Sequence, residues 1–174
     1  MTKNKIHITC INGSSIDGRI TDVHHHFHQW SSPEDQKLLK SEIKKADCII
    51  VGYITYKRSV DLLKNKRTIV FNRRNIRYLN NHIYFIKPNK KTLFKILHST
   101  QSKKALVIGG MNTYSWFIKQ NIVDQWCLTI EPYFFGAGLP LLRIKEFKPK
   151  GARLKSVKRI NNKGTLLLRY IINK

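Results

Sequence analysis

The sequence predicts an α/β domain with a mostly parallel central sheet, flanked by helices and closed by a C-terminal antiparallel hairpin. Short apolar runs alternate with segments of helical periodicity along most of the 174-residue chain, as expected where helices connect parallel strands. Apolar residues make up 41% of the sequence, which suffices for a core and argues against disorder. The last two apolar runs are joined only by the turn-forming residues 161–164, which favours a hairpin.

The first half of the chain opens with a strand at 5–12, where β-branched residues are frequent. Residues 13–32 contain Gly, Ser and His and are expected to form a long loop. A helix is expected to begin at Ser32 and Pro33, because Ser is a favoured N-cap and Pro suits the first helical position. Three more elements follow, namely a strand at 47–53, a helix at 55–63 and a strand at 67–72.

The second half continues this alternation. It is expected to contain strands at 83–86, 105–108 and 125–131, and helices at 91–98 and from 111 onward. The runs 154–160 and 165–172 form the hairpin, and the apolar strand 166–172 would leave an exposed sheet edge. No repeat, linker or low-complexity segment divides residues 1–174, which are therefore expected to be one domain.

The most informative motif is the turn Ile108-Gly109-Gly110, which joins an apolar strand directly to a helical segment. Glycines there let a ligand approach the backbone, and the amides of a helix start attract phosphate. Two further strand ends carry similar groups: Gly52 with Thr55, and Asn72 with Arg73 and Arg74. Ligands of open α/β sheets bind at the carboxyl ends of strands, so one extended anion would contact all three. A tight strand–helix connection without a ligand is the alternative for the glycine turn.

Taken together, these residues resemble the dihydrofolate reductase superfamily over nearly the whole chain. Gly52 with Thr55 is similar to its G-x-x-T junction, Ile108-Gly109-Gly110 to its I-G-G turn, and residues 30–35 to its W-x-x-P-x-D segment. Residues 15–20 and 123–141 resemble one branch, the reductase (C-terminal) domain of the bifunctional riboflavin biosynthesis deaminase-reductase. The resemblance implies the dihydrofolate reductase-like fold and reduction by NADPH.

The resemblance also implies roles for individual residues. The cofactor site would comprise Gly52, Thr55, Asn72, Arg73, Ile108, Gly109, Gly110, Met111, Asn112, Thr113 and Tyr114. The substrate site would comprise Ser15, Asp17, Trp30 and Asp35. The sequence departs from the superfamily at Tyr53, which replaces a usual arginine, and at Met111, which replaces a third glycine. Arg73 is therefore the candidate for binding the 2′-phosphate of NADPH.

Asp35 is the candidate catalytic residue. The resemblance implies that its carboxylate binds the N–C–N edge of a pterin or pyrimidine ring and helps to deliver a proton. The alternative is structural, because Ser32 and Asp35 form a capping-box-like pattern at a helix start. Asp17 also has a structural alternative to substrate binding, since Asp-Gly is an ordinary turn. Tyr114 falls where the superfamily has a tyrosine near the nicotinamide, but it also fits the core of its helix.

The charge raises an alternative class of function. With 33 basic and 10 acidic residues, the formal charge is +23, which is compatible with nucleic-acid binding. The basic residues are spread along the chain, however, and a cationic protein also suits a phosphorylated substrate and cofactor. Nucleic acid is therefore not expected to be the primary ligand.

The cysteines and histidines do not indicate a metal site. The cysteines lie in separate apolar segments and are expected to be buried free thiols: Cys10, Cys48 and Cys127. A cluster of histidines lacks partner ligands at metal-site spacing and is expected to lie in a solvated loop: His24, His25, His26 and His28. No metal is therefore expected.

The glycine junctions and the resemblance to the riboflavin branch together predict an NADPH-dependent reductase. It would transfer hydride to 5-amino-6-(5-phosphoribosylamino)uracil or a related pyrimidine. Dihydrofolate is the alternative substrate, and a basic nucleic-acid-binding protein on this fold is a third interpretation. The riboflavin-branch resemblance and the expected sheet edge predict a homodimer. No apolar run approaches the ~18 residues that a membrane helix needs, and we see no secretory signal, so a cytoplasmic protein is expected.

Overall fold

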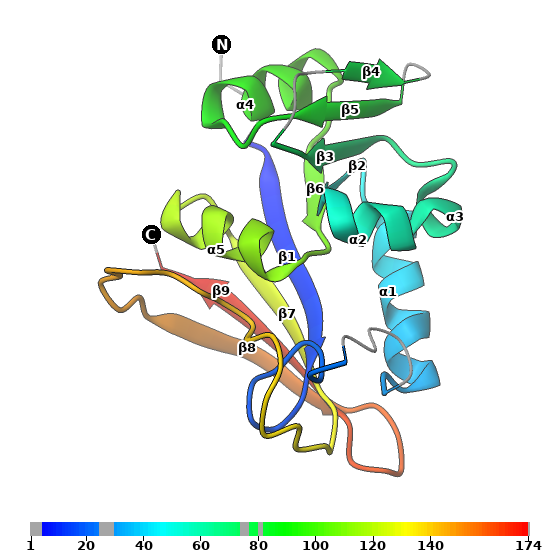
Figure 1. The fold of residues 1–174 in the computed structure, drawn as a ribbon, viewed down its shortest axis with the longest axis vertical. Helices are drawn as coiled ribbons and strands as arrows, with labels where there is room; N and C mark the ends of the chain where they lie inside the picture. Colours follow the sequence, from blue (N-terminus) through cyan, green and yellow to red (C-terminus); the bar gives the residue numbers. More distant parts are fainter. Residues whose placement is uncertain (1–4, 25–29, 74–76, 80–81, 174) are drawn as a thin grey trace.

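The computed structural model describes residues 5–24, 30–73, 77–79 and 82–173. Its strands are β1 (His7–Ser14), β2 (Cys48–Gly52), β3 (Thr68–Phe71), β4 (Arg77–Leu79), β5 (Ile83–Ile86), β6 (Lys104–Val107), β7 (Gln125–Ile130), β8 (Ala152–Arg159) and β9 (Leu166–Ile172). Its helices are α1 (Pro33–Lys45), α2 (Tyr53–Arg58), α3 (Val60–Leu63), α4 (Lys90–Ser99) and α5 (Met111–Lys119). The strands form one nine-stranded sheet in the order β4-β5-β3-β2-β6-β1-β7-β9-β8 (Figure 1).

The strand pairing confirms the predicted fold class. β1 pairs in parallel with β6 and β7, and β2 pairs in parallel with β3 and β6. At the C-terminal end the direction reverses, because β9 lies antiparallel to both β7 and β8. The sheet is therefore mostly parallel at its centre and carries an antiparallel hairpin at one edge.

Three details of the sequence prediction are wrong. The segment expected as one helix at 55–63 forms the two short helices α2 and α3, because the backbone leaves helical geometry at Ser59, where φ is −122°. β4 was not expected, since it is short and pairs antiparallel at the edge beside β5. The strand at 166–172 is not an edge, because β9 lies between β7 and β8. The edge strand at this end of the sheet is β8, whose exposed Arg and Lys side chains discourage pairing with another sheet.

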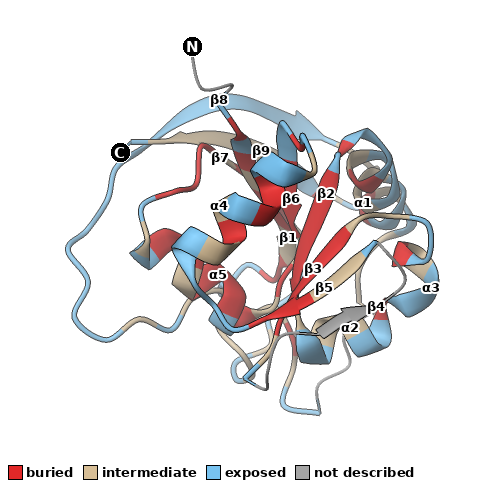
Figure 2. Ribbon diagram, turned by 90° about the horizontal axis from the view of Figure 1, so that it is seen from above, coloured by how far each residue is buried: buried red, intermediate tan, exposed pale blue. Residues whose placement is uncertain are grey.

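Helices cover both faces of the sheet (Figure 1). α4 and α5 pack on one face through Leu97 and Phe117, and α1 packs on the other face through Ile43. The central strands β2, β3 and β6 are largely buried between these layers, whereas β8 is exposed along its whole length (Figure 2). Continuous apolar strands are typical of a parallel sheet that is covered on both faces.

The start of α1 has the cap that the sequence predicts. Ser32 has an extended backbone, its hydroxyl oxygen accepts a hydrogen bond of 3.3 Å from the backbone N–H of Asp35, and Pro33 takes the first helical position. This cap places Asp35 in the first turn of α1, against the last residues of β1. A Cβ atom on Gly13 of β1 would lie 3.3 Å from Oδ2 of Asp35.

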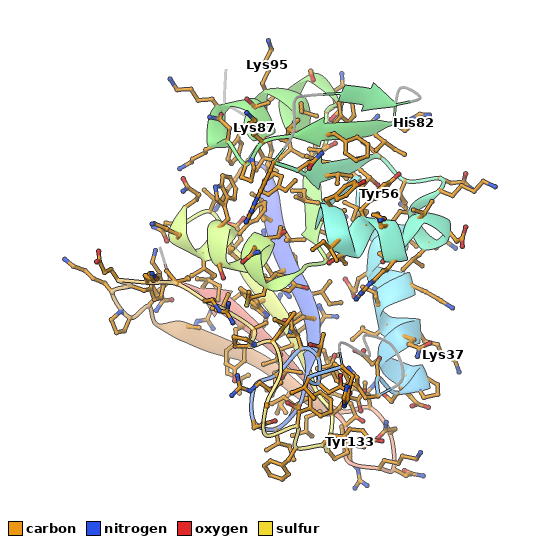
Figure 3. The ribbon with its side chains drawn as sticks, in the orientation of Figure 1. Lys37, Tyr56, His82, Lys87, Lys95 and Tyr133 are labelled. Carbon is orange, nitrogen blue, oxygen red and sulfur yellow. The ribbon has the colours of Figure 1, made fainter. Side chains whose placement is uncertain are left out.

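The basic side chains do not gather on one element. Lys37 extends from α1 and Lys95 from α4, at well-separated places on the surface (Figure 3). The positive charge is therefore distributed over the molecule, as the sequence indicates. Among the residues that the structure describes, no helix combines the length and the apolar character that a membrane span requires.

Candidate active site

Two junctions lie side by side at the carboxyl ends of β2 and β6, and in each a strand passes through glycine directly into a helix. The backbone N–H of Gly52 donates a hydrogen bond of 2.7 Å to the carbonyl oxygen of Gly109, and the N–H of Ile108 donates to the carbonyl of Ile50 at 3.0 Å. Because β2 and β6 are neighbours in the sheet, glycines that are far apart in the sequence meet here. The two junctions form one continuous backbone surface.

Larger side chains do not fit at this glycine surface. A Cβ atom on Gly52 would lie 2.7 Å from Oγ1 of Thr113, and one on Gly109 would lie 3.0 Å from the hydroxyl oxygen of Tyr114. Gly109 also has a φ of +116°, which L side chains rarely adopt, and its peptide bond to Gly110 is cis. The contacts and the positive φ therefore both require glycine at position 109.

Thr55 and the start of α5 complete the surface. A Cβ atom on Gly110 would lie 3.2 Å from Oγ1 of Thr55, so the Thr55 hydroxyl lies beside the glycine turn. α5 begins at Met111 with Gly110 as its N-cap, and no side chain caps its first amides. A hydroxyl and the amides of a helix start beside a glycine turn are groups that bind phosphate.

A cleft opens beside the glycine turn and extends to the start of α1. Seven residues of the predicted site line it: Trp30, Asp35, Thr55, Ile108, Gly109, Gly110 and Tyr114. Gly52 and Thr113 contact the turn from behind. The structure therefore brings the predicted substrate carboxylate and the predicted cofactor turn to the same cleft.

Asp35 is a buried acid, with 8% of its surface exposed. The hydroxyl of Ser31 donates a hydrogen bond of 2.6 Å to its Oδ2. Burial raises the pKa of the Asp35 carboxyl group and the negative charge of Glu131 adds to the rise, although the hydroxyls of Ser31 and Thr129 oppose it. The net direction is upward, so Asp35 holds a proton more readily than an exposed aspartate.

Trp30 lines the cleft between Gly13 and Phe135. Its ring meets the Phe135 ring edge-on at a centroid distance of 5.2 Å, and a Cβ atom on Gly13 would lie 3.4 Å from it. Within the described part of the chain, Nε1 of Trp30 is buried and has no hydrogen-bond partner. A buried donor on a cleft residue suits an acceptor on a bound ligand.

Tyr114 contributes its ring to the cleft and its hydroxyl to the scaffold. The hydroxyl donates a hydrogen bond of 2.6 Å to the carbonyl oxygen of Ile11 in β1. Burial raises the pKa of Tyr114 well above its ordinary value. The phenol therefore stays neutral and ties α5 to the sheet.

Ser15 and Asp17 are not among the described residues that line the cleft. The Ser15 hydroxyl donates to Asp17 at 2.6 Å, and the Asp17 carboxylate accepts from the N–H groups of Phe135 and Gly136 at 3.2 and 2.9 Å. The hydrogen bond from Ser15, with those two backbone bonds, lowers the pKa of Asp17. These contacts hold the loop at 15–20 against the loop that follows β7, and the predicted substrate contacts stay a prediction.

The remaining predicted cofactor residues lie near the same edge of the sheet. Asn72 and Arg73 follow β3, which is the neighbour of β2, and Arg73 is exposed. Arg74 lies outside the described residues. In the first turn of α5, Met111 and Thr113 are buried and Asn112 is exposed.

Two further residues at the site were not predicted. Arg58 ends α2 and lines the cleft, and Glu131 follows β7 with 1% of its surface exposed. Glu131 accepts hydrogen bonds from the Ser32 N–H at 2.8 Å and from the Thr165 hydroxyl at 2.7 Å. One sequence feature could have pointed to Glu131: it is an acid that directly follows an apolar strand, in a chain with only 10 acidic residues.

The cysteines are buried free thiols, which confirms the prediction for them: Cys10, Cys48 and Cys127. Burial raises the pKa of Cys48 to about 12 and that of Cys127 to about 11. Over the described residues, no group of three or more His, Cys, Asp or Glu side chains could hold a metal ion. His25, His26 and His28 lie outside the described residues.

The fold and this cleft can be compared with known proteins. The model of the RibD C-terminal domain family matches residues 6–166. The chain belongs to this family. Its sequence is also 25% identical over 100 residues to the uncharacterized protein YwjB of Bacillus subtilis (strain 168), a match that covers 55% of this chain and 58% of YwjB. The chain thus spans a little more than half the length of this curated relative.

Solved structures share the fold. A pyrimidine reductase-like protein from Corynebacterium diphtheriae superposes with a TM-score of 0.78 at 16% identity, covering 98% of this chain and 93% of that one. Dihydrofolate reductase from Enterococcus faecalis, complexed with NADP(H), superposes with a TM-score of 0.64 at 18% identity over 97% of each chain. These similarities confirm the dihydrofolate reductase-like fold of this RibD C-terminal domain protein.

Proposed function

We propose that this protein is an NADPH-dependent reductase of the riboflavin biosynthesis type, which transfers hydride to 5-amino-6-(5-phosphoribosylamino)uracil or a related pyrimidine. One observation carries the proposal: the buried carboxyl group of Asp35 and the Gly109-Gly110 turn line the same cleft. A phosphate-binding surface and a ring-binding carboxyl group are thereby close together, as transfer between two bound reactants requires. Membership of the RibD C-terminal domain family supports the same class of reaction.

The glycine surface fits NADPH. The glycines allow the side chains of Thr55, Thr113 and Tyr114 to pack against the turn, and the start of α5, which no side chain caps, offers amides to a pyrophosphate. Thr55, Gly109 and Gly110 would hold the phosphates, Gly52 would support the turn from behind, and Arg73 would bind the 2′-phosphate. When bound, NADPH supplies the hydride.

The cleft also fits a phosphorylated pyrimidine. Arg58 is the one cation among the described residues that line it, and a guanidinium group binds phosphate through paired hydrogen bonds. The same arginine would suit the glutamate tail of dihydrofolate. We therefore propose the pyrimidine rather than dihydrofolate because of the family and because of the riboflavin-branch segments at 15–20 and 123–141.

Asp35 and Trp30 would orient the substrate and supply polar contacts. Asp35 would bind the donors of the ring edge, and its raised pKa allows its carboxyl group to carry a proton that it passes to the acceptor as the hydride arrives. The buried Nε1 of Trp30 would donate to a carbonyl oxygen of the ring. The rings of Trp30 and Tyr114 would exclude water from this part of the cleft.

The test is an NADPH-oxidation assay with both substrates. We expect kcat/KM for the phosphoribosyl pyrimidine to exceed that for dihydrofolate by at least about tenfold, which is a difference of about 1.4 kcal/mol in transition-state binding. Efficient reduction of dihydrofolate alone would make the substrate assignment wrong. Calorimetry that detects no NADPH binding would remove the reductase proposal altogether, and steeply salt-dependent binding of long polyanions would favour the nucleic-acid interpretation.

We also propose a cytoplasmic homodimer. Free thiols suit a reducing compartment, and the riboflavin-branch resemblance supports a dimer. Light scattering at moderate salt is expected to give twice the mass of one chain. A monomeric mass would refute the dimer and would leave the cleft, which residues of one chain line, unaffected.

A further inference from the structure

Glu131 joins three elements around the candidate active site. It directly follows β7 and is almost fully buried. One carboxylate oxygen accepts from the backbone N–H of Ser32, the N-cap of α1, and the other accepts from the hydroxyl of Thr165, which directly precedes β9. A buried carboxylate is costly unless it is hydrogen-bonded, so these two bonds account for its position.

The same network reaches Asp35 on one side and the hairpin on the other. The Ser32 hydroxyl accepts from the N–H of Asp35, so Glu131 and Asp35 are bound to the same cap residue. Asn161, in the turn between β8 and β9, donates to the Thr165 hydroxyl at 2.7 Å and to the carboxylate of Glu34 at 3.3 Å. The start of α1 is therefore fixed by the end of β7 and by the C-terminal hairpin.

We propose that Glu131 is a positioning residue for Asp35, which anchors the start of α1 and places a negative charge behind the Asp35 carboxyl group. The inference deepens the proposed function and rests on it where turnover is concerned. Its effect on Asp35 itself does not depend on any substrate or cofactor.

Besides Glu131, two charged residues lie near Asp35: Glu34 precedes it in the first turn of α1, and Arg58 lines the same cleft. The remaining groups around Asp35 are uncharged. They are the hydroxyls of Ser31 and Thr129, the buried phenol of Tyr114 and the thiol of Cys127. The charge of Glu131 contributes to the raised pKa of Asp35, because a like charge favours the protonated form. Removing this charge should therefore lower the pKa of Asp35, while burial continues to raise it.

The test is a carboxyl ¹³C NMR titration of the protein without ligands. The Asp35 resonance is assigned by its loss in Asp35→Asn. Glu131→Gln keeps the size of the side chain and an oxygen that accepts from Ser32, but it removes the charge. We expect the Asp35 midpoint to fall by on the order of 1 pH unit in Glu131→Gln. An unchanged midpoint in the folded variant would overturn the proposal.

A second variant keeps the proposal testable if Glu131→Gln does not fold. Glu131→Met also removes the charge and has a side chain of similar volume, so it should lower the Asp35 midpoint in the same direction as Glu131→Gln. Thr165→Val is the matched control, because it removes one hydrogen bond from Glu131 but leaves its charge. Its Asp35 midpoint should stay near that of the wild type. An Asp35 midpoint that is unchanged in folded Glu131→Met would exclude the coupling.

Turnover gives the third readout. A protonated Asp35 is the proton donor, so activity should be lost as pH rises through its pKa. In Glu131→Gln this loss should occur at lower pH, with kcat affected more than the Kd of NADPH. A shift in the NMR midpoint without a shift in the pH–kcat profile would retain the role of Glu131 and make the role of Asp35 in proton transfer wrong.

Discussion

The two halves of the cleft are built in different ways. The proposed cofactor half is backbone, made of two glycine junctions at the ends of adjacent strands, where the N–H of Gly52 donates to the carbonyl of Gly109. The proposed substrate half depends on side chains: Asp35 of α1 lines it, and Glu131 and Thr165 hold the start of α1 through hydrogen bonds. Short local sequence motifs encode the first half, whereas the second half forms only when segments that are distant in the sequence pack together. Substitutions should therefore affect the two halves separately.

The largest expected effect is that of Asp35→Asn. The amide keeps the size of the side chain but cannot hold the proton, so turnover should fall by about 10²–10⁴-fold. NADPH affinity should stay within about twofold, because the glycine surface is untouched. Steady-state kinetics and calorimetry measure the two quantities.

Glu34→Gln is the matched control for this substitution. Glu34 is the neighbouring acid of the same turn, and its described hydrogen bond is to Asn161 rather than to a cleft residue. It should keep nearly full activity. Full activity in Asp35→Asn would mean that Asp35 acts only at the helix start.

The next effect concerns the backbone half. Gly109→Ala forces a side chain into a backbone with φ of +116° and against the Tyr114 hydroxyl, so NADPH affinity should fall by about 10–100-fold. Gly164→Ala is the control, since φ is +99° there but nothing lies within 4 Å of the added Cβ atom. Equal losses of cofactor affinity in both variants would show that general strain, not the glycine surface, is responsible.

Arg58→Ala should show whether Arg58 binds the phosphate of the substrate or only supports the binding of its ring. Arg58 is the cation on the described cleft lining, so its loss should raise KM for the phosphorylated pyrimidine by about tenfold. KM for the dephosphorylated pyrimidine should change little. If both values rise equally, Arg58 supports the cleft and does not bind the phosphate. Lys64→Ala, at an exposed lysine directly after α3, is the matched surface control.

The same contrast explains what the sequence could predict. The alternation of strands and helices, the Ser32 cap and the two glycine junctions were predictable, because each depends on neighbouring residues. The roles of Glu131 and Arg58 were not, because neither has a local motif and each gains its meaning from the segments that it contacts. The sheet edge was assigned to 166–172 instead of β8, since apolar character along the sequence does not show which strand lies outermost.

The smallest expected effect is on the choice between NADPH and NADH. Tyr53 stands where the superfamily usually has an arginine, and Arg73 at the end of β3 is the proposed replacement. Arg73 is exposed, so its pairing with a 2′-phosphate is screened by solvent and should contribute only about 3–10-fold to NADPH affinity. Arg73→Ala should therefore weaken NADPH binding by that factor and leave NADH binding unchanged.

Lys57 is the competitor that makes this prediction sharp. Its Nζ lies 5.9 Å from the centroid of the Tyr53 ring, beside the position that the usual arginine would occupy. Calorimetry on Arg73→Ala and Lys57→Ala with both cofactors separates the two residues. The preference for NADPH over NADH should also shrink as the salt concentration rises, if an exposed cation binds the 2′-phosphate. Exposed charges are screened within about 8–10 Å at moderate ionic strength. A selective loss of NADPH affinity in Lys57→Ala, with none in Arg73→Ala, would move the 2′-phosphate site from the end of β3 to α2.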